Sequence, residues 1–111
     1  MIRHDPRDIG RHAVAAHPGR PAVAVALDTA DARLVVFRLA PGQEVPSHTS
    51  SSTVILSVVS GAGVIAGGAT EVAVATGDIV SFTPGEPHGM RAEDGELVLL
   101  ATITPRPGER N

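Results

Sequence analysis

Short apolar runs, separated by turn-forming residues, recur along most of this sequence. The runs are AVAVAL, RLVVFRLA, TVILSVVS, GVIAG, EVAVA, IVSFT and ELVLLATIT. Segments rich in glycine, proline and aspartate separate these runs. Many short strands with regularly spaced turns are typical of antiparallel sandwiches and barrels. The alternation of small and branched residues in AVAVAL and EVAVA has the period of two that a strand requires. The sequence therefore predicts an all-β fold.

Several turns can be assigned before any fold is known. The run AVAVALDTADARLVVF predicts a hairpin with residues 28–32 at its tip. Gly61–Gly63 and Gly67–Gly68 are each expected to form a hairpin turn, and Glu93–Gly95 a further turn. Because glycine follows proline at position 85, a type II turn with a positive φ at Gly85 is expected there.

The 111 residues are enough for one domain with one core. We expect an N-terminal arm over residues 1–20, a barrel over 21–104 and a C-terminal tail over 105–111. The arm is expected to be extended: Asp5-Pro6 could begin a helical turn, but Gly10 weakens its continuation. The tail carries two prolines and is expected to fray.

Absent residue types exclude several kinds of chemistry. The chain has no cysteine, so it has no thiol nucleophile, disulfide or thiolate zinc site. All nine basic residues are arginine, which excludes a Schiff-base lysine. The net charge of −3 and the lack of Trp and Tyr argue against nucleic-acid binding. No apolar run has the length of a membrane span and no signal peptide is visible, so a cytoplasmic location is expected.

Two segments carry the most specific spacing in the chain. Gly42 precedes His48 with five residues between them, and Gly61 stands thirteen residues beyond His48. The second segment, GDIVSFTPGEPHGM, begins at Gly77 and contains His88. Together these segments resemble the two sequence motifs of the cupin superfamily, over roughly residues 33–103. The resemblance implies a single cupin-type jelly-roll barrel of two antiparallel sheets. The alternative, an immunoglobulin-like sandwich, lacks its Cys-Trp-Cys framework.

The resemblance also implies a metal site that this chain has partly lost. Cupins usually hold a divalent metal with two histidines and a glutamate from the first motif and a histidine from the second. His48 and His88 occupy two of these positions, whereas Ser50 replaces the second histidine and Val54 replaces the glutamate. We therefore expect a degenerate pocket without a resident cofactor. If a divalent transition metal were bound, its protein ligands would be His48 and His88.

One further carboxylate lies close to the first motif histidine in the sequence. Glu44 shares the alternation of His48, so it could reach the same pocket, but Pro46 interrupts the strand geometry between them. Arg38 and Arg91 flank the motif strands, where a surface salt bridge is the expected role. The histidines of the arm are too widely spaced for a local metal site.

The predicted pocket is mainly apolar, with two imidazoles at its mouth. Ser50 and Thr53 would offer hydrogen bonds to a ligand, and Leu56 and Val58 are expected to add to the apolar lining. Such a pocket suits a small, partly apolar molecule. The predicted ligand-binding residues are His48, Ser50, Thr53, Val54, Phe82, His88 and Met90.

Three function classes remain open at this stage. The first, which we favour, is a small-molecule-binding protein without chemistry of its own. The second is a metal-dependent oxygenase or isomerase that uses the two histidines, completed by water or Glu44. The third is a metal-free enzyme with His48 or His88 as general base on a sugar or keto acid. No catalytic residue is assigned. A homodimer is expected because a small sandwich leaves sheet edges open, and AVAVAL could pair with a partner's sheet, with the arm lying across the interface.

Overall fold

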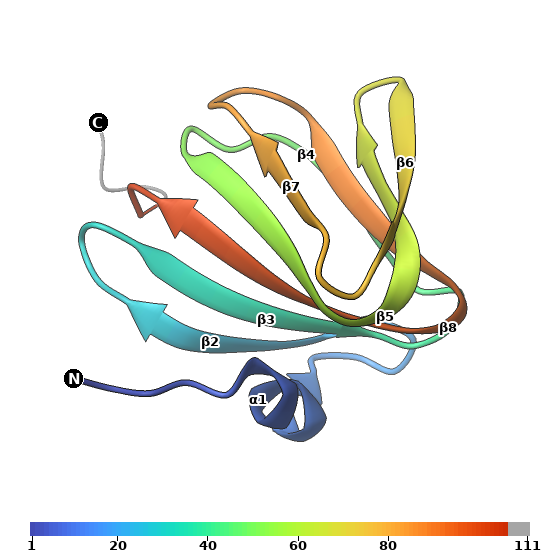
Figure 1. Cartoon of the computed structure of the whole chain (residues 1–111), viewed down its shortest axis with the longest axis horizontal. Helices are drawn as coiled ribbons and strands as arrows, with labels where there is room; N and C mark the ends of the chain where they lie inside the picture. The colour runs from blue at the N-terminus through green and yellow to red at the C-terminus, as the bar shows by residue number, and fades with distance from the viewer. Residues whose placement is uncertain (107–111) are drawn as a thin grey trace.

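Antiparallel strands make up most of the molecule, as a computed structural model that describes residues 1–106 shows (Figure 1). The all-β prediction is confirmed. Helix α1 spans Pro6–His12, and the strands are β1 (Val14–Ala15), β2 (Ala22–Asp28), β3 (Arg33–Leu39), β4 (Glu44–His48), β5 (Thr53–Gly67), β6 (Thr70–Ala75), β7 (Ile79–Phe82) and β8 (His88–Thr104). None of the described helical residues forms a segment long and apolar enough to cross a membrane.

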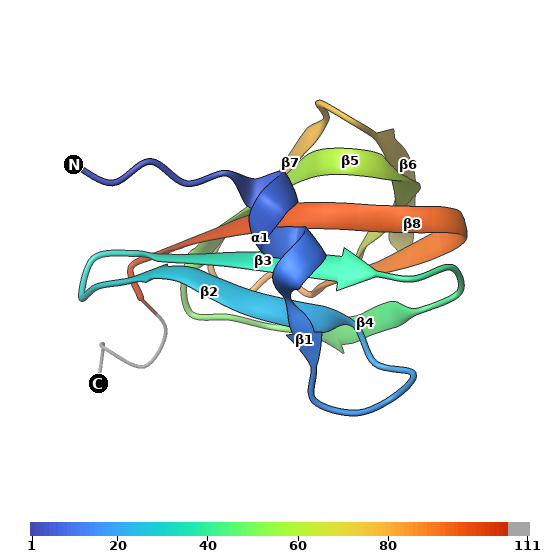
Figure 2. The same cartoon turned by 90° about the horizontal axis from the view of Figure 1, so that it is seen from below.

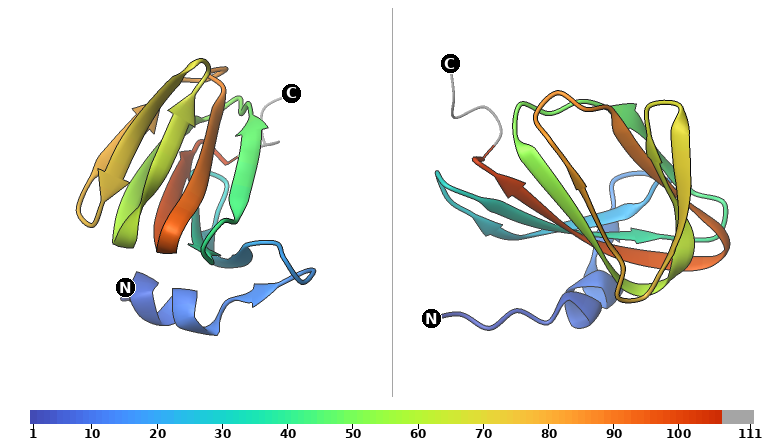
Figure 3. Two further views of the ribbon diagram at one scale, coloured as in Figure 1. Left: turned by 90° about the vertical axis from the view of Figure 1, so that its right-hand side faces the viewer. Right: turned by 45° about the horizontal axis from the view of Figure 1, so that its top comes forward.

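Two long strands, β5 and β8, are shared by two sheets that face each other (Figure 3). Residues 53–61 of β5 pair with 97–104 of β8, and β3, β2, β1 and β7 extend this first sheet. Residues 63–66 of β5 pair with 89–92 of β8, and β4 and β6 lie on either side. The two sheets are therefore continuous with each other along β5 and β8, as expected for the predicted jelly roll.

The passage of β5 from one sheet to the other occurs at Gly61. Its φ is +88°, and a Cβ built there would lie 2.0 Å from the carbonyl oxygen of Glu96. The register between β5 and β8 also shifts on both sides of this glycine. The hairpin predicted at Gly61–Gly63 and the turn predicted at Glu93–Gly95 are both wrong, because each segment lies within a continuous strand. The glycines there permit a bend with irregular pairing rather than a chain reversal.

Other predicted turns are confirmed. β2 and β3 form a hairpin in which Asp28 pairs with Arg33. Gly68, with a φ of +61°, lies at the tip of the β5–β6 hairpin. Gly85 has a φ of +87°, and the Glu86 N–H donates to the Thr83 carbonyl at 3.1 Å. This is the geometry of the predicted type II turn between β7 and β8.

The core lies between the two sheets and is almost purely apolar. It forms because alternate side chains of β3, β5 and β8 point to the same interior face. Leu39, Leu97 and Leu99 are fully inaccessible to solvent. The buried cluster comprises Val35, Leu39, Val54, Leu56, Val58, Ile65, Val74, Phe82, Met90, Ala92, Leu97, Leu99 and Ala101.

The N-terminal segment contains a helix, so the prediction of an extended arm is wrong for residues 6–12. The helix begins because the Asp5 carboxylate accepts hydrogen bonds from the backbone N–H groups of Arg7 and Asp8 at 3.1 and 3.2 Å. Pro6, at the first helical position, has a φ already suited to a helix.

Gly10, which argued against this helix, instead lies where the helix packs closely against the sheet. α1 lies across the outer face of β3 and β8 (Figure 2), and a Cβ at Gly10 would lie only 3.1 Å from a methyl carbon of Val98. The Arg38 guanidinium closes the helix end by donating to the carbonyl oxygens of Gly10 and Arg11 at 2.5 and 3.0 Å. The small glycine therefore allows the helix to approach the sheet closely. The predicted bounds of arm, barrel and tail stay predictions, and residues 107–111 of the tail lie outside the described residues.

Candidate functional site

His48 and His88, forty residues apart in the sequence, lie side by side where β4 pairs with β8. Their ring centroids are 4.3 Å apart, and the ring planes meet at 62° in an edge-to-face arrangement. His48 is exposed at the edge strand, whereas His88 is only 4% exposed. The pair therefore joins a solvent-facing imidazole to a buried one at the mouth of the barrel.

A bulge in β4 places His48 on this face. Val45 pairs with Met90 and His48 pairs with His88, so three steps along β4 match two along β8. The extra residue puts Val45 and His48 on the same face despite their odd spacing. Glu44 pairs with Arg91 instead, is exposed, and does not line the pocket beside the histidines. Simple alternation from Glu44 to His48 therefore fails at Pro46.

Both imidazoles are held in the same way by the backbone. Nδ1 of His48 lies 3.0 Å from the carbonyl oxygen of Pro46, and Nδ1 of His88 lies 3.0 Å from that of Glu86. A carbonyl oxygen only accepts hydrogen bonds, so each Nδ1 carries the proton and donates it. In the neutral rings the lone pair therefore resides on Nε2.

The Nε2 atom of His88 borders accessible space. Among residues 1–106, every fully buried polar side-chain atom has a hydrogen-bond partner, and no partner of this Nε2 is found. It must therefore be reachable by solvent or ligand, and His88 lines a pocket with His48. The two rings together offer a pair of hydrogen-bond acceptors.

This pocket, which we call the histidine pocket, has a volume of about 210 Å³. Apart from the two imidazoles, no lining side chain is ionisable. Of the seven predicted ligand-binding residues, the structure brings together His48, Ser50, Val54, His88 and Met90 around this space. The full lining is Phe37, His48, Thr49, Ser50, Val54, Leu56, His88, Met90, Ala101 and Ile103.

Thr53 and Phe82 do not line the histidine pocket. Thr53 precedes the inward-facing Val54 and so faces the other side of β5, half-buried. Phe82 is buried in the core, and its ring centroid lies 5.1 Å from that of His88. Phe82 therefore packs against the His88 imidazole from within the core. Val58 also lies in the core rather than at the pocket.

Residues from distant strands complete the walls and were missed from the sequence. Phe37 comes from β3, and Ala101 and Ile103 come from the end of β8. No polar motif marks these positions. The period-two patterns of the sequence contain a signal for them. Phe37 alternates with Val35 and Leu39 in RLVVFRLA, and Ala101 and Ile103 alternate with Leu97 and Leu99 in ELVLLATIT.

The turn before His88 is tied to the loop that carries Ser50. The Gly85 N–H donates to the Ser50 carbonyl oxygen at 2.8 Å. The Glu86 carboxylate accepts from the backbone N–H and the hydroxyl of Thr83, both at 2.8 Å. These two hydrogen bonds, the backbone one first, hold the pKa of Glu86 below its usual value of 4.5. The turn therefore fixes the approach of His88 to the pocket.

The residues present do not fit the metal site that the family usually has. Residues 1–106 contain no group of three or more His, Asp or Glu side chains placed to hold a metal ion. A catalytic zinc takes about three protein ligands and a structural zinc four. The two imidazoles supply two nitrogens, Ser50 a weak neutral oxygen, and Val54 nothing. A dication here would lack any carboxylate to balance its charge.

Comparison with known proteins yields one family and several similar folds. The family model described as "Cupin domain" matches residues 35–103. A Thermus thermophilus protein has 25% identity and a TM-score of 0.84, with 96% of this chain and 100% of that chain covered. A conserved Klebsiella pneumoniae protein with a double-stranded β-helix domain has 27% identity and a TM-score of 0.79, with 87% of each chain covered. A Thermotoga maritima protein described as a predicted oxalate decarboxylase has 25% identity and a TM-score of 0.73, with 77% of this chain and 80% of that chain covered. The search of curated proteins gave no match.

Proposed function

This chain belongs to the cupin family, and we propose that it is a small-molecule-binding member that works without a resident metal. Family membership alone does not decide this, because one fold serves many activities. The proposal rests on the histidine pocket, where two imidazoles with fixed tautomers meet apolar walls and no carboxylate. Such a pocket can bind a small molecule through hydrogen bonds, but it has too few coordinating side chains for a metal.

The size and polarity of the pocket define the ligand class. A volume of about 210 Å³ corresponds to roughly seven water molecules at about 30 Å³ each and lies below the usual range for drug-sized ligands. Two Nε2 acceptors call for a ligand that donates hydrogen bonds. The walls of Phe37, Leu56 and Ile103 call for an apolar body. The ligand is therefore a small, mainly apolar molecule with one or two hydroxyl groups.

Paired fragments that differ in one hydroxyl test this directly. Phenol and toluene have similar shapes, but only phenol can donate to an Nε2 atom. In two-dimensional NMR titrations, phenol should shift the amide signals of the pocket at lower concentration than toluene. The double variant His48→Ala, His88→Ala should remove this preference, because it removes both Nε2 acceptors, whereas His12→Ala, at an exposed histidine on α1, should keep it. Equal responses to both fragments, or a preference that survives the loss of both histidines, would contradict the proposal.

One observation favours a second candidate, a metal-dependent cupin enzyme with a reduced two-histidine site. A ring N–H donated to a backbone carbonyl commonly orients a metal-bound histidine, and both rings have it. Elemental analysis of the purified protein separates the two candidates. One equivalent of a transition metal that is lost in His48→Ala would favour the second, and no stoichiometric metal the first.

A further inference from the structure

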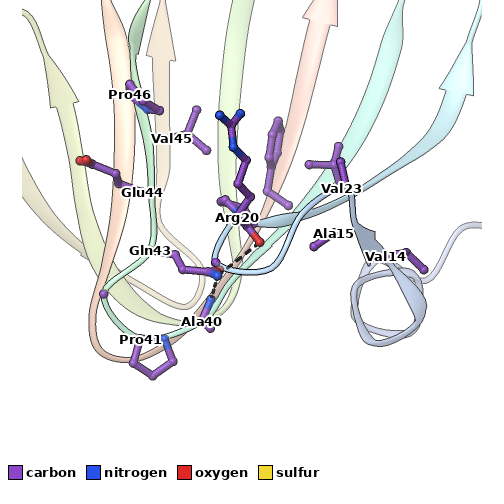
Figure 4. Close-up of a pocket in the computed structure, with 15 residues that line it drawn as sticks. Val14, Ala15, Arg20, Val23, Ala40, Pro41, Gln43, Glu44, Val45 and Pro46 are labelled. Atoms are coloured by element: carbon purple, nitrogen blue, oxygen red, sulfur yellow. Dashed lines mark hydrogen bonds between the residues drawn. The ribbon is translucent and has the colours of Figure 1, made fainter.

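A groove much larger than the histidine pocket opens between β1 and β2 on one side and β4 with the loop before it on the other. Its volume is about 1020 Å³, against about 210 Å³ for the histidine pocket. Figure 4 shows Ala15 and Val23 on one wall and Val45 on the other. Among residues 1–106, Phe37 alone lines both cavities. The groove is therefore a separate space, to which the proposed function assigns no role.

The walls of the groove are apolar because the inner face of the first sheet continues along β2 and β1. Val14 pairs with Val23 across these strands, and Val23 pairs with Phe37 of β3. Directly opposite residues of antiparallel strands share a face, so all three lie on the face that covers the core. Val14 and Val23 nevertheless remain 78% and 42% exposed. An exposed apolar surface in a concave site favours binding of an apolar group.

A tight turn places Arg20 at the edge of the groove. In the segment HPGR, the Arg20 N–H donates to the His17 carbonyl oxygen at 3.2 Å, and Gly19 has a φ of +85°. Proline at the second position of a turn and a positive φ at the third are the features of a type II turn. Pro21 then favours an extended backbone at Arg20. Figure 4 shows the Arg20 side chain reaching from this turn into the space between the walls.

Gln43 ties this turn to the loop on the opposite side. Its side-chain N–H donates to the Arg20 carbonyl oxygen at 3.3 Å, and its side-chain oxygen accepts from the Ala40 N–H at 2.9 Å (Figure 4). The Gln43 backbone N–H also donates to the Ala40 carbonyl oxygen at 3.0 Å. These hydrogen bonds fix the backbone of Arg20 before any ligand arrives. A preorganised site loses less conformational entropy when it binds.

The charges at the groove favour an anionic group on the ligand. Among the described residues, Arg20 is the one cation that lines the groove, and no ion pair involves it. A guanidinium can hold a carboxylate with two parallel hydrogen bonds. Glu44 is the one anion in the lining, and its carboxylate points away from Arg20 (Figure 4). It leaves Arg20 open to one carboxylate and repels a second one at the β4 rim.

We propose that the groove is a second ligand site, which binds a medium-chain fatty acid. The carboxylate of the ligand pairs with Arg20, and its alkyl chain lies along Val23, Phe37 and Val45. The volume of about 1020 Å³ is at the upper end of the range of roughly 300–1,000 Å³ that small-molecule sites occupy. This site uses neither His48 nor His88, so it goes beyond the proposed function.

Titration with octanoate and with octanol, followed by two-dimensional NMR, tests the site. The two probes share one alkyl chain, and only octanoate carries a charge. Both should shift amide signals of residues 14–23 and 40–46, and octanoate should do so at lower concentration. In the series hexanoate, octanoate and decanoate, each added CH₂ group should tighten binding by up to about fourfold.

Two pairs of variants separate the head group from the chain. Arg20→Gln should weaken octanoate about fivefold and leave it no better than octanol. Arg3→Gln removes the same charge at an exposed residue outside the groove and should keep the preference. Val23→Asp should weaken both probes, because it places a charge on the apolar wall. Ile79→Asp, at a 67% exposed residue of β7 outside the groove, should not. Circular dichroism should show all four variants folded.

Several outcomes would overturn the proposal. The first is no shift of these signals with octanoate, and the second is a preference for octanoate that survives Arg20→Gln. The third is loss of octanoate binding in the double variant His48→Ala, His88→Ala, which would assign the probe to the histidine pocket. The fourth is light scattering that gives twice the chain mass of 11.3 kDa, reduced to one chain by Val23→Asp, without octanoate binding, which would assign the groove to a second copy.

The phenol titration keeps the two ligand sites distinguishable. Arg20→Gln should leave the preference for phenol over toluene unchanged, because Arg20 does not line the histidine pocket. Failure of phenol to bind, with octanoate still bound, would overturn the proposed function and leave the groove site standing. The reverse result would overturn the groove site alone.

Discussion

The double variant Ser50→His, Val54→Glu should turn the histidine pocket into a metal site. Positions 50 and 54 line the same pocket as His48 and His88. The variant therefore brings a third imidazole and a carboxylate to the two imidazoles already there. The four groups are those that the cupin motifs usually supply.

The cost of the carboxylate follows from its burial. Val54 is only 3% exposed, so a glutamate there loses most of its hydration, and an uncompensated buried charge costs about 3–5 kcal/mol. We expect about 3 kcal/mol because the pocket opens to solvent, which corresponds to a fall in Tm of about 12–20 °C. Binding of a metal at a concentration a hundredfold above its Kd stabilises the folded state by about 2.7 kcal/mol. Metal should therefore recover most of the lost stability.

Thermal unfolding with and without Zn²⁺, Mn²⁺ or Ni²⁺ measures the stability lost on substitution and the stability regained on metal binding. The double variant should gain about 10–15 °C with metal, the wild type should not respond, and elemental analysis should find one equivalent in the variant alone. His88→Ala added to the double variant should abolish the gain. A double variant that neither loses stability nor binds metal would show that these side chains do not converge. A metal-dependent shift in the wild type, lost in His48→Ala, would refute the claim that two imidazoles are too few.

Two further predictions concern glycines and one carboxylate. Gly61 and Gly85 have nearly equal φ values of +88° and +87°, but only at Gly61 would a Cβ meet a backbone atom, 2.0 Å from the Glu96 carbonyl oxygen. Urea unfolding should therefore show that Gly85→Ala lowers the free energy of unfolding by about 1–2 kcal/mol. Gly61→Ala should lower it by more than about 3 kcal/mol. Similar losses in the two variants would contradict the clash at Gly61. The pKa of Glu86 is lowered by its hydrogen bonds from Thr83, so its contribution to stability is present above pH 4.5 and is lost as the pH falls through the lowered pKa. The difference in Tm between wild type and Glu86→Gln should shrink on acidification, and a difference that grows would reverse the assigned sign.

The sequence predicted most strands but not their continuity. Alternation and turn residues place the β2–β3 and β5–β6 hairpins correctly, because those reversals are local. Gly61–Gly63 has the same local signature, yet the chain continues in β5, because long-range pairing with β8 decides its path. Similarly, the low helix propensity of Gly10 predicts a break in the helix. In the structure, the lack of a side chain at this position lets the helix pack closely against Val98. Tertiary packing of this kind cannot be read from neighbours in the sequence.

The candidate site was predictable where a motif marks it. His48, Ser50, Val54, His88 and Met90 belong to the motif segments and all line the pocket. The apolar walls from other strands have no such mark, and the predicted lining residues Thr53 and Phe82 face elsewhere. The extra residue at the β4 bulge changes which side chains share a face, and a count by twos cannot detect it.

The sharing of β8 between both sheets has a consequence for synthesis of the chain. β8 is the last described strand, β4 pairs with it alone among the described strands, and β3 has only β2 beside it until β8 arrives. A nascent chain on the ribosome therefore lacks the centre of both sheets until residues 88–104 have emerged. Until then, the earlier strands lack their β8 neighbour and their apolar faces stay exposed. Folding is therefore expected only after translation of nearly the whole domain. A ribosome-bound fragment ending at Phe82 should consequently exert no folding force and should engage chaperones for longer than an early-folding helical domain of equal length.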